Sequence, residues 1–148
     1  MYYIKEGYFV HFAKLNKVYR KMCYQAVEEY RFTANEIEVM MFLANNPGLD
    51  TASDIAGYKN ISKGLVAKSV DSLCRSGYLA TQKDTRDRRV IHLILTEQSA
   101  PVVERLKHGR TEFINLLQAG VEPADLEAME RATEQMNKNL NEMLGRIK

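Results

Sequence analysis

The stretch Asp84-Thr85-Arg86-Asp87-Arg88-Arg89 does most to decide how this chain folds. Short β-prone runs stand on both sides of it, at 78–81 and at 90–95, so the whole segment predicts a β-hairpin with a charged tip. Desolvating so many guanidinium groups would be costly, and we therefore expect the tip to project into solvent. Arginine there favours planar, bidentate contact with a phosphate or the edge of a base. The alternative is a solvated turn without a binding role, because runs of charged residues usually lie on solvent-exposed surface.

Two short helices are expected before the hairpin, each opened by a capping box. Thr33 and Glu36 have the required spacing and open a helix that stops at 46–48, where Asn, Pro and Gly follow one another. Thr51 and Asp54 repeat the same device ahead of a helix of about two turns.

A third helix follows a brief turn at 58–61. Ser62 is its expected N-cap, and Gly77 is expected to close it in the left-handed conformation. The predicted buried row is Val66, Val70 and Leu73. The other faces carry mainly small and charged residues, Lys63, Gly64, Ala67, Lys68, Asp71 and Arg75. A short helix, a turn, a second helix with such a face and a charged hairpin together predict a winged helix-turn-helix, within a mainly α (α+β) fold.

In this arrangement the third helix is the candidate for entering the major groove of DNA. Such a helix must present small or hydrogen-bonding residues so that its backbone can approach the base edges. Placed after it, the charged tip is better explained by DNA contact than by a solvated turn. His92, on the second strand, is expected to face solvent or DNA. The candidate DNA-binding residues are Ser62, Lys63, Gly64, Ala67, Lys68, Ser69, Arg75, Lys83, Arg86, Asp87, Arg88 and Arg89.

The distribution of charge agrees with this reading better than its total does. The 148-residue chain has a formal net charge of only +2. Between Lys59 and Arg89, however, eight basic and three acidic residues leave an excess of five positive charges. The positive potential is therefore concentrated in about a fifth of the sequence, as expected for a nucleic-acid footprint.

Long amphipathic helices are expected at both ends, at about 4–30, 96–119 and from Pro123 onward. In the second of these we expect Val103, Leu106, Phe113, Leu116 and Leu117 to face inward. The helices carry more apolar surface than a small central domain can cover, which favours a homodimer over an intramolecular bundle. The sequence thus divides into a dimerisation region, 1–32 with 97–148, and a DNA-binding lobe, 33–96. The expected dimerisation residues are Phe12, Leu15, Tyr19, Met136, Leu140, Met143 and Ile147.

The hairpin and its flanks resemble the MarR family of bacterial transcriptional regulators. The resemblance rests on Asp84-x-Arg86-Asp87-x-Arg89, on the strand 90–97 after it, and on 73–79 before it. It implies that Arg89 or Arg86 enters the minor groove, and that Asp87 holds the arginine fork through a salt bridge. The chain departs from many members at Leu65 and Ala67, where Ser or Thr is common.

The resemblance also implies a small-molecule effector, often aromatic or anionic, bound between the dimerisation helices and the DNA-binding lobe. The alternative is that these Met and aromatic positions are simply core, which their helical spacing favours. Cys23 is either an oxidant sensor or a buried structural thiol, and the sequence offers no partner that would lower its pKa. The candidate effector-binding residues are His11, Tyr19, Met22, Cys23 and Met40.

Other classes of function find no support in the sequence. The three histidines are scattered, no phosphate-binding glycine loop is present, and the Cys and His residues lack ligand spacing, so we expect neither an enzyme nor a metal or cofactor. No apolar run is long enough to span a membrane, and residues 1–6 do not resemble a signal peptide, which predicts a cytoplasmic protein.

The sequence therefore predicts a homodimeric, ligand-responsive transcriptional repressor that binds double-stranded DNA. Helix 62–76 would read the major groove and wing 84–89 the minor groove of a pseudo-palindromic operator. The alternative is a winged-helix module whose hairpin contacts protein rather than a specific DNA sequence.

Overall fold

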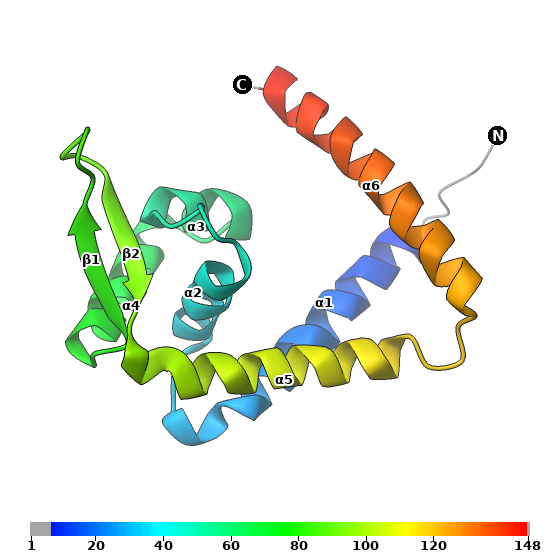
Figure 1. Cartoon of the computed structure of the whole chain (residues 1–148), viewed down its shortest axis with the longest axis horizontal. Helices are drawn as coiled ribbons and strands as arrows, with labels where there is room; N and C mark the ends of the chain where they lie inside the picture. Colours follow the sequence, from blue (N-terminus) through cyan, green and yellow to red (C-terminus); the bar gives the residue numbers. More distant parts are fainter. Residues whose placement is uncertain (1–6, 148) are drawn as a thin grey trace. The chain divides into compact units, whose positions relative to one another are not determined.

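The computed structural model describes residues 7–147, in two compact units (Figure 1). The first unit ends at Phe113 and the second begins at Ile114, within a single helix. The fold is mostly helical with a two-stranded antiparallel hairpin, as predicted. In chain order the elements are α1 (Gly7–Ala26), η1 (Glu28–Tyr30), α2 (Ala34–Asn45), α3 (Ala52–Lys59), α4 (Lys63–Arg75), β1 (Leu79–Lys83), β2 (Ile91–Leu95), η2 (Glu97–Ser99), α5 (Ala100–Leu117) and α6 (Pro123–Arg146).

Both capping boxes form as the sequence predicts. The Thr33 hydroxyl accepts from the Glu36 amide at 3.2 Å, and the Glu36 carboxylate accepts from the Thr33 amide at 3.1 Å. Thr51 and Asp54 make the equivalent pair of bonds ahead of α3, each 3.1 Å long. These reciprocal bonds satisfy amides that the first helical turn leaves without a partner.

The predicted limits of α4 are also confirmed. The Ser62 hydroxyl caps its start by accepting from the Leu65 amide at 3.2 Å. Gly77 ends it with φ of +86°, and the Tyr78 amide then donates to the Leu73 carbonyl at 2.9 Å. A side chain at position 77 would be strained by this φ, and its Cβ would lie 2.5 Å from the Gln98 Oε1.

The predicted limits of α1 and α5 were less accurate. The start of the first helix, expected near Ile4, lies outside the described residues. Its end was placed at Tyr30, but α1 stops at Ala26, and a 3₁₀ turn leads to Arg31 in the left-handed conformation with φ of 56°. This break places Val27 in the core. The later helix, expected from Thr96, begins with the 3₁₀ turn η2 before α5.

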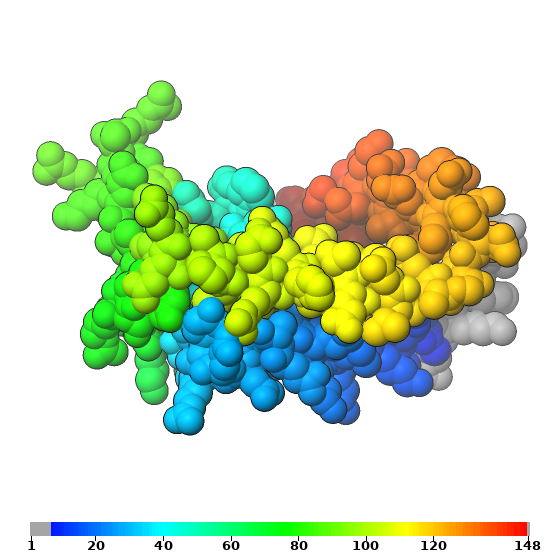
Figure 2. All heavy atoms as spheres, turned by 60° about the horizontal axis from the view of Figure 1, so that its bottom comes forward, coloured from blue at the N-terminus to red at the C-terminus, as the bar shows by residue number. Residues whose placement is uncertain are grey.

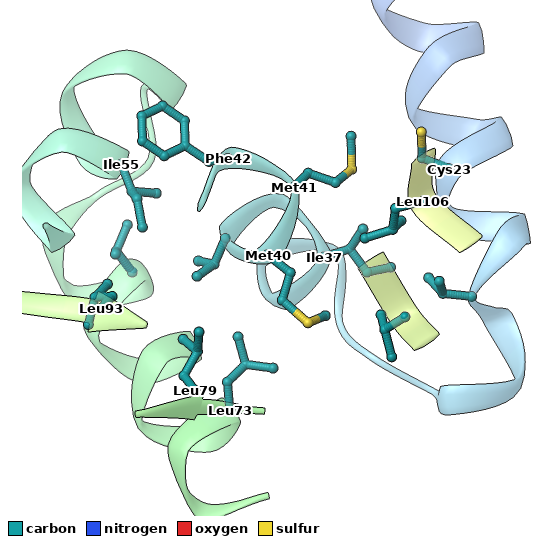
Figure 3. Packing of buried hydrophobic residues seen from close by; sticks show 14 residues of the cluster. Cys23, Ile37, Met40, Met41, Phe42, Ile55, Leu73, Leu79, Leu93 and Leu106 are labelled. Carbon is teal, nitrogen blue, oxygen red and sulfur yellow. The ribbon is translucent and has the colours of Figure 1, made fainter. Parts of the chain in front are cut away.

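The core of the first unit surrounds α2. Every residue from Glu36 to Phe42 is buried, so this helix is enclosed on several sides rather than along one stripe. Figure 3 shows Met40 and Ile37 pointing from α2 into the cluster, Leu73 and Leu79 on the side of α4 and the hairpin, and Leu106 on the side of α5.

The inward face of α5 differs from the prediction at its C-terminal end. Its buried residues are Val102, Leu106, Gly109 and Phe113. Val103 is only half-buried, and Leu116 and Leu117 are exposed at 64% and 44%, so placing both leucines inward was wrong. They follow Phe113, where the first unit and its core end.

The hairpin pairs β1 with β2 from Leu79 opposite Leu95 to Lys83 opposite Ile91. Midway along the hairpin, the Leu93 amide donates to the Asp50 carbonyl at 2.8 Å and attaches β2 to the link between α2 and α3. No helix within residues 7–147 is both long and apolar enough to cross a membrane.

Candidate nucleic-acid interface

The outer face of α4 carries most of the residues predicted to contact DNA. Val66 and Leu73 are fully buried on the inner face, against α2 and α3. Val70, predicted in the same row, is only half-buried. Leu65 is 47% exposed and adds an apolar side chain to the outer face. The exposed residues of the predicted set on α4 and its cap are Ser62, Lys63, Gly64, Ala67, Lys68 and Arg75.

Ser69 does not belong to that exposed face. Its exposed fraction is 6%, because it lies three residues after Val66 and four before Leu73 and so shares their buried row. The expectation that Ser69 supplies a DNA contact is therefore wrong. A helical spacing of three and four from both buried neighbours was the signal that could have shown this.

The tip of the hairpin is ordered by Asp84. Its Oδ2 accepts from the backbone amides of Arg86 and Asp87 at 2.9 and 2.8 Å, which fixes the turn. These two bonds, together with a hydrogen bond from His92, lower the pKa of Asp84 to about 2, with the His92 bond as the largest cause.

Asp87 and Arg89 form the paired fork that the family resemblance implies. Arg89 Nε and Nη2 lie 3.1 and 3.2 Å from the two carboxylate oxygens of Asp87, and this pairing lowers the pKa of Asp87. The Arg89 side chain is nevertheless 91% exposed. Figure 2 shows the side chains of the hairpin tip, in green, extending away from the body of the first unit. The guanidinium is thus oriented before any contact is made, and its outer edge is free to bind.

His92 lies between two carboxylates that the sequence did not predict as its partners. Its Nδ1 lies 2.7 Å from Asp50 Oδ1 and its Nε2 lies 2.8 Å from Asp84 Oδ1. The side chain is 31% exposed and is held between the two carboxylates, so it faces solvent only in part. Hydrogen bonds to Asp84 and then to Asp50 raise the pKa of His92.

A second charged cluster, absent from the sequence predictions, surrounds Glu38 on α2. Arg20 Nε of α1 lies 3.0 Å from Oε1, and Lys59 Nζ at the end of α3 lies 3.1 Å from Oε2. The Tyr24 hydroxyl donates to Oε1 at 2.7 Å; burial, followed by this bond, raises the pKa of Tyr24. Lys59 was counted in the basic excess, but its charge is paired inside the fold.

Of the five candidate effector residues, the structure places Cys23 and Met40 in one core cluster, with Tyr19 packed against it. Cys23 and Met40 are fully buried in the core, and burial raises the pKa of the Cys23 thiol. His11 is exposed on α1. Tyr19 packs against Phe113 with ring centroids 5.2 Å apart, and burial is the main cause that raises the pKa of Tyr19 to about 12.

Two open grooves lie beside α1. The larger, about 720 Å³, is formed by α1 with the segment up to the start of α2, and its lining includes Lys17, Arg20 and Lys21. The smaller, about 440 Å³, lies between α1 and α5 and contains Met22. Within residues 7–147 no group of three His, Cys, Asp or Glu residues is placed to hold a metal ion.

Apolar side chains expected at a dimer interface are exposed in the single chain. Phe12 on α1 is 44% exposed, and α6 has no buried residue. Leu15 and Tyr19 are half-buried within the first unit. The exposed apolar residues of the predicted α6 stripe are Met136, Leu140, Met143 and Ile147, at 38%, 53%, 53% and 71%.

The order α2, α3, α4 and hairpin, with an exposed basic face on α4 and an arginine fork on the wing, defines a winged helix-turn-helix protein. Residues 32–90 match the model of the MarR family.

Comparisons with known sequences and structures give three further matches. The transcriptional regulator AdcR of Streptococcus pyogenes serotype M6 is 32% identical over 88 residues, which span 60% of this chain and 58% of that regulator. The crystal structure of a MarR transcriptional regulator from Methanosarcina mazei Go1 shares the fold over 94% of this chain and 99% of its own, with a TM-score of 0.76 and 22% identity. The crystal structure of the adhesin competence repressor AdcR from Streptococcus pyogenes matches 76% of this chain and 85% of its own, with a TM-score of 0.54 and 29% identity.

Proposed function

We propose that this chain is a homodimeric, sequence-specific DNA-binding transcriptional regulator, and that it acts as a repressor. The observation that carries the proposal is the combination of an exposed, small and basic face on α4 with a wing arginine that Asp87 already orients. The names of the AdcR relatives, a transcriptional regulator and a repressor, support it. The lobe 33–96 would bind DNA, while 1–32 and 97–148 would form the dimer.

Each recognition helix would enter the major groove, and each wing would reach the adjacent minor groove. In a dimer the two helices would lie about 34 Å apart on one face of a pseudo-palindromic site. Lys63, in the first turn of α4, would read a base, Lys68 would contact the backbone, and Arg89 or Arg86 would enter the minor groove.

The test is selection of bound sites from a random duplex library, followed by titration of the selected duplex at several salt concentrations. A regulator that neutralises several phosphates should lose affinity steeply between about 50 and 200 mM salt. A convergent two-fold consensus together with this salt slope would support the proposal. Selection without any consensus would contradict it.

The competing function is a winged-helix module whose hairpin contacts a protein. Ile91 and Ile94 favour it, because these apolar residues of β2 are 46% and 42% exposed. The same selection distinguishes the two functions, because a protein-interaction module should not enrich any particular duplex sequence.

The dimer is supported by the exposed apolar stripe of α6, which a second copy would cover. Light scattering should then report twice the 17.0 kDa chain, about 34 kDa. Leu140→Glu would place an unpaired charge in the apolar seam and should shift the protein toward monomer. Lys138→Glu, on the opposite side of the same helix, is the matched control and should remain dimeric.

The response to a small molecule is the least supported part of the proposal. The groove beside α1 offers Lys17 and Lys21 to an anionic ligand. Of the residues first proposed for this role, His11, Tyr19 and Met22 are at least partly accessible, whereas Cys23 and Met40 are core. A panel of aromatic carboxylates, screened for release of the selected duplex, tests the response. Release by none of them would contradict an effector of this class.

A further inference from the structure

We propose that His92 is a positioning residue that clamps the wing to the link between α2 and α3, and that deprotonation of His92 loosens the wing and weakens its hold on DNA. The clamp is a contact within the fold, while the effect on DNA rests on the proposed function. The observation behind it is a histidine ring held at 2.7 and 2.8 Å between Asp50 and Asp84, two carboxylates from different segments.

The clamp belongs to a continuous chain of bonds that ends at the wing arginine. Asp84 uses Oδ1 for His92 and Oδ2 for the amides of Arg86 and Asp87. Asp87 in turn holds the guanidinium of Arg89. The tip of the wing is thus attached, through His92, to the residue directly before the N-cap of α3.

Only the protonated ring can maintain both contacts as hydrogen bonds. A neutral imidazole has one N–H, so its other nitrogen would direct a lone pair at a carboxylate. Among the described residues, the charged groups that face the ring are Asp84 from the wing turn and Asp50 from the link. Its cross-strand neighbour on β1, Gln82, is uncharged.

The direction of the pH effect follows from these partners. Both carboxylates favour the charged ring and raise the pKa of His92 above its ordinary value near 6.5. The clamp is therefore complete below about pH 6.5, and it is lost as the pH rises through the raised pKa. Asp84, with a pKa of about 2, stays ionised throughout this range and does not oppose the change.

The first measurement needs no DNA. Fast motion of the wing amides of Arg86 and Asp87 is followed by heteronuclear NMR relaxation in the full-length protein, from pH 6 to pH 9. We expect these amides to become more mobile as the His92 ring loses its proton, in step with the chemical shift of the ring. Wing amides that stay equally ordered while the ring titrates would overturn the clamp.

Asp50→Asn tests the clamp from the side of the link and leaves the wing sequence intact. We expect this variant to titrate His92 at lower pH and to loosen the wing at lower pH than the wild type. His108→Gln, which removes an exposed histidine on α5, is the matched control and should leave the pH profile of the wing unchanged. Identical profiles for Asp50→Asn and wild type would also overturn the clamp.

The second measurement is the affinity for the duplex selected by the wild-type chain at pH 6. Loss of one hydrogen bond in the clamp should weaken binding about threefold to tenfold as the pH rises through the raised pKa. The Asp50→Asn variant should show this loss at lower pH. If the wing loosens with pH but no duplex is ever retained, the clamp stands and the proposed function fails. If the affinity for the duplex does not fall as the wing amides become more mobile, the clamp does not control DNA binding.

Discussion

Two clusters of charged side chains join distant segments of the first unit, one around Glu38 and one around His92. Glu38 gathers partners from α1 and α3, and its side chain is only 4% exposed. His92 joins the wing to the link before α3, and its side chain is 31% exposed. The carboxylate at the centre of the first cluster is shielded from water, whereas the imidazole at the centre of the second is partly exposed to it.

This difference assigns the clusters different roles. A buried carboxylate must keep its partners, because an unpaired charge in a low-dielectric interior is costly. The Glu38 cluster is therefore expected to hold α1, α2 and α3 together at every ordinary pH. A half-exposed imidazole can exchange its proton with solvent, so the contacts of the His92 cluster are adjustable at ordinary pH.

The largest expected effect comes from removing the partners of Glu38. In the double variant Arg20→Met and Lys59→Met, the buried carboxylate loses both cations. We expect the free energy of unfolding to fall by about 3–5 kcal/mol, measured by urea denaturation at fixed protein concentration.

The matched control adds Glu38→Met to the same background. Replacing a whole buried ionic group by apolar side chains of similar size is often close to neutral, so the triple variant should recover most of the lost stability. A loss below about 1 kcal/mol in the double variant would mean that water already reaches Glu38, and the contrast between the clusters would disappear.

The next effect concerns DNA rather than stability. Arg89→Ala should cost about 1–3 kcal/mol of binding to the selected duplex if the guanidinium makes a direct base-edge contact. The midpoint of unfolding should not move, because the Arg89 side chain is 91% exposed. Lys14→Ala removes one positive charge from the exposed surface of α1 and is the control for a general loss of charge. Equal affinities for Arg89→Ala and Lys14→Ala would remove the wing from the proposed interface.

Local signals in the sequence predicted the helix limits of the lobe well. The three N-caps could be predicted because each bonds an amide only three residues further along the chain, as Thr33, Thr51 and Ser62 do. The end of α4 could be predicted because glycine readily adopts the positive φ found at Gly77. The basic face of α4 follows from helical period alone. The errors on this helix were Ser69, which shares the buried row of Val66 and Leu73, and Val70, which is only half-buried.

Contacts between distant segments could not be predicted in the same way. Asp50 lies 42 residues before His92, and Glu38 meets Arg20 and Lys59 only because α1, α2 and α3 pack around it. Neither a helical spacing nor a capping motif in a single sequence indicates which distant residues will become partners. For the same reason Leu116 and Leu117 were placed inward, since helical spacing does not reveal where the core beneath a helix ends.

A smaller effect is expected for Asp87→Ala, which removes the carboxylate that orients the Arg89 guanidinium but leaves the guanidinium in place. Affinity for the selected duplex should fall by less than in Arg89→Ala, because the guanidinium can still reach its contact after losing its orientation. Stability should be unchanged, since exposed ion pairs contribute little. The two variants and their combination form a double-mutant cycle. If the two losses simply add, Asp87 does not act through Arg89, and the wing lacks the proposed orientation.

The smallest effect separates two lysines on the outer face of α4. Lys63 follows the cap in the first turn, and Lys68 lies further along the exposed surface. A lysine that contacts only phosphate weakens binding to every sequence alike, so Lys68→Ala should reduce the salt slope by about one and keep the consensus. Lys63→Ala should instead change the preferred base at one position in each half-site, because a base-reading lysine donates to guanine. Binding-site selection with both variants in parallel decides this. If Lys63→Ala keeps the wild-type consensus, the division of roles is wrong, while DNA binding by α4 still stands.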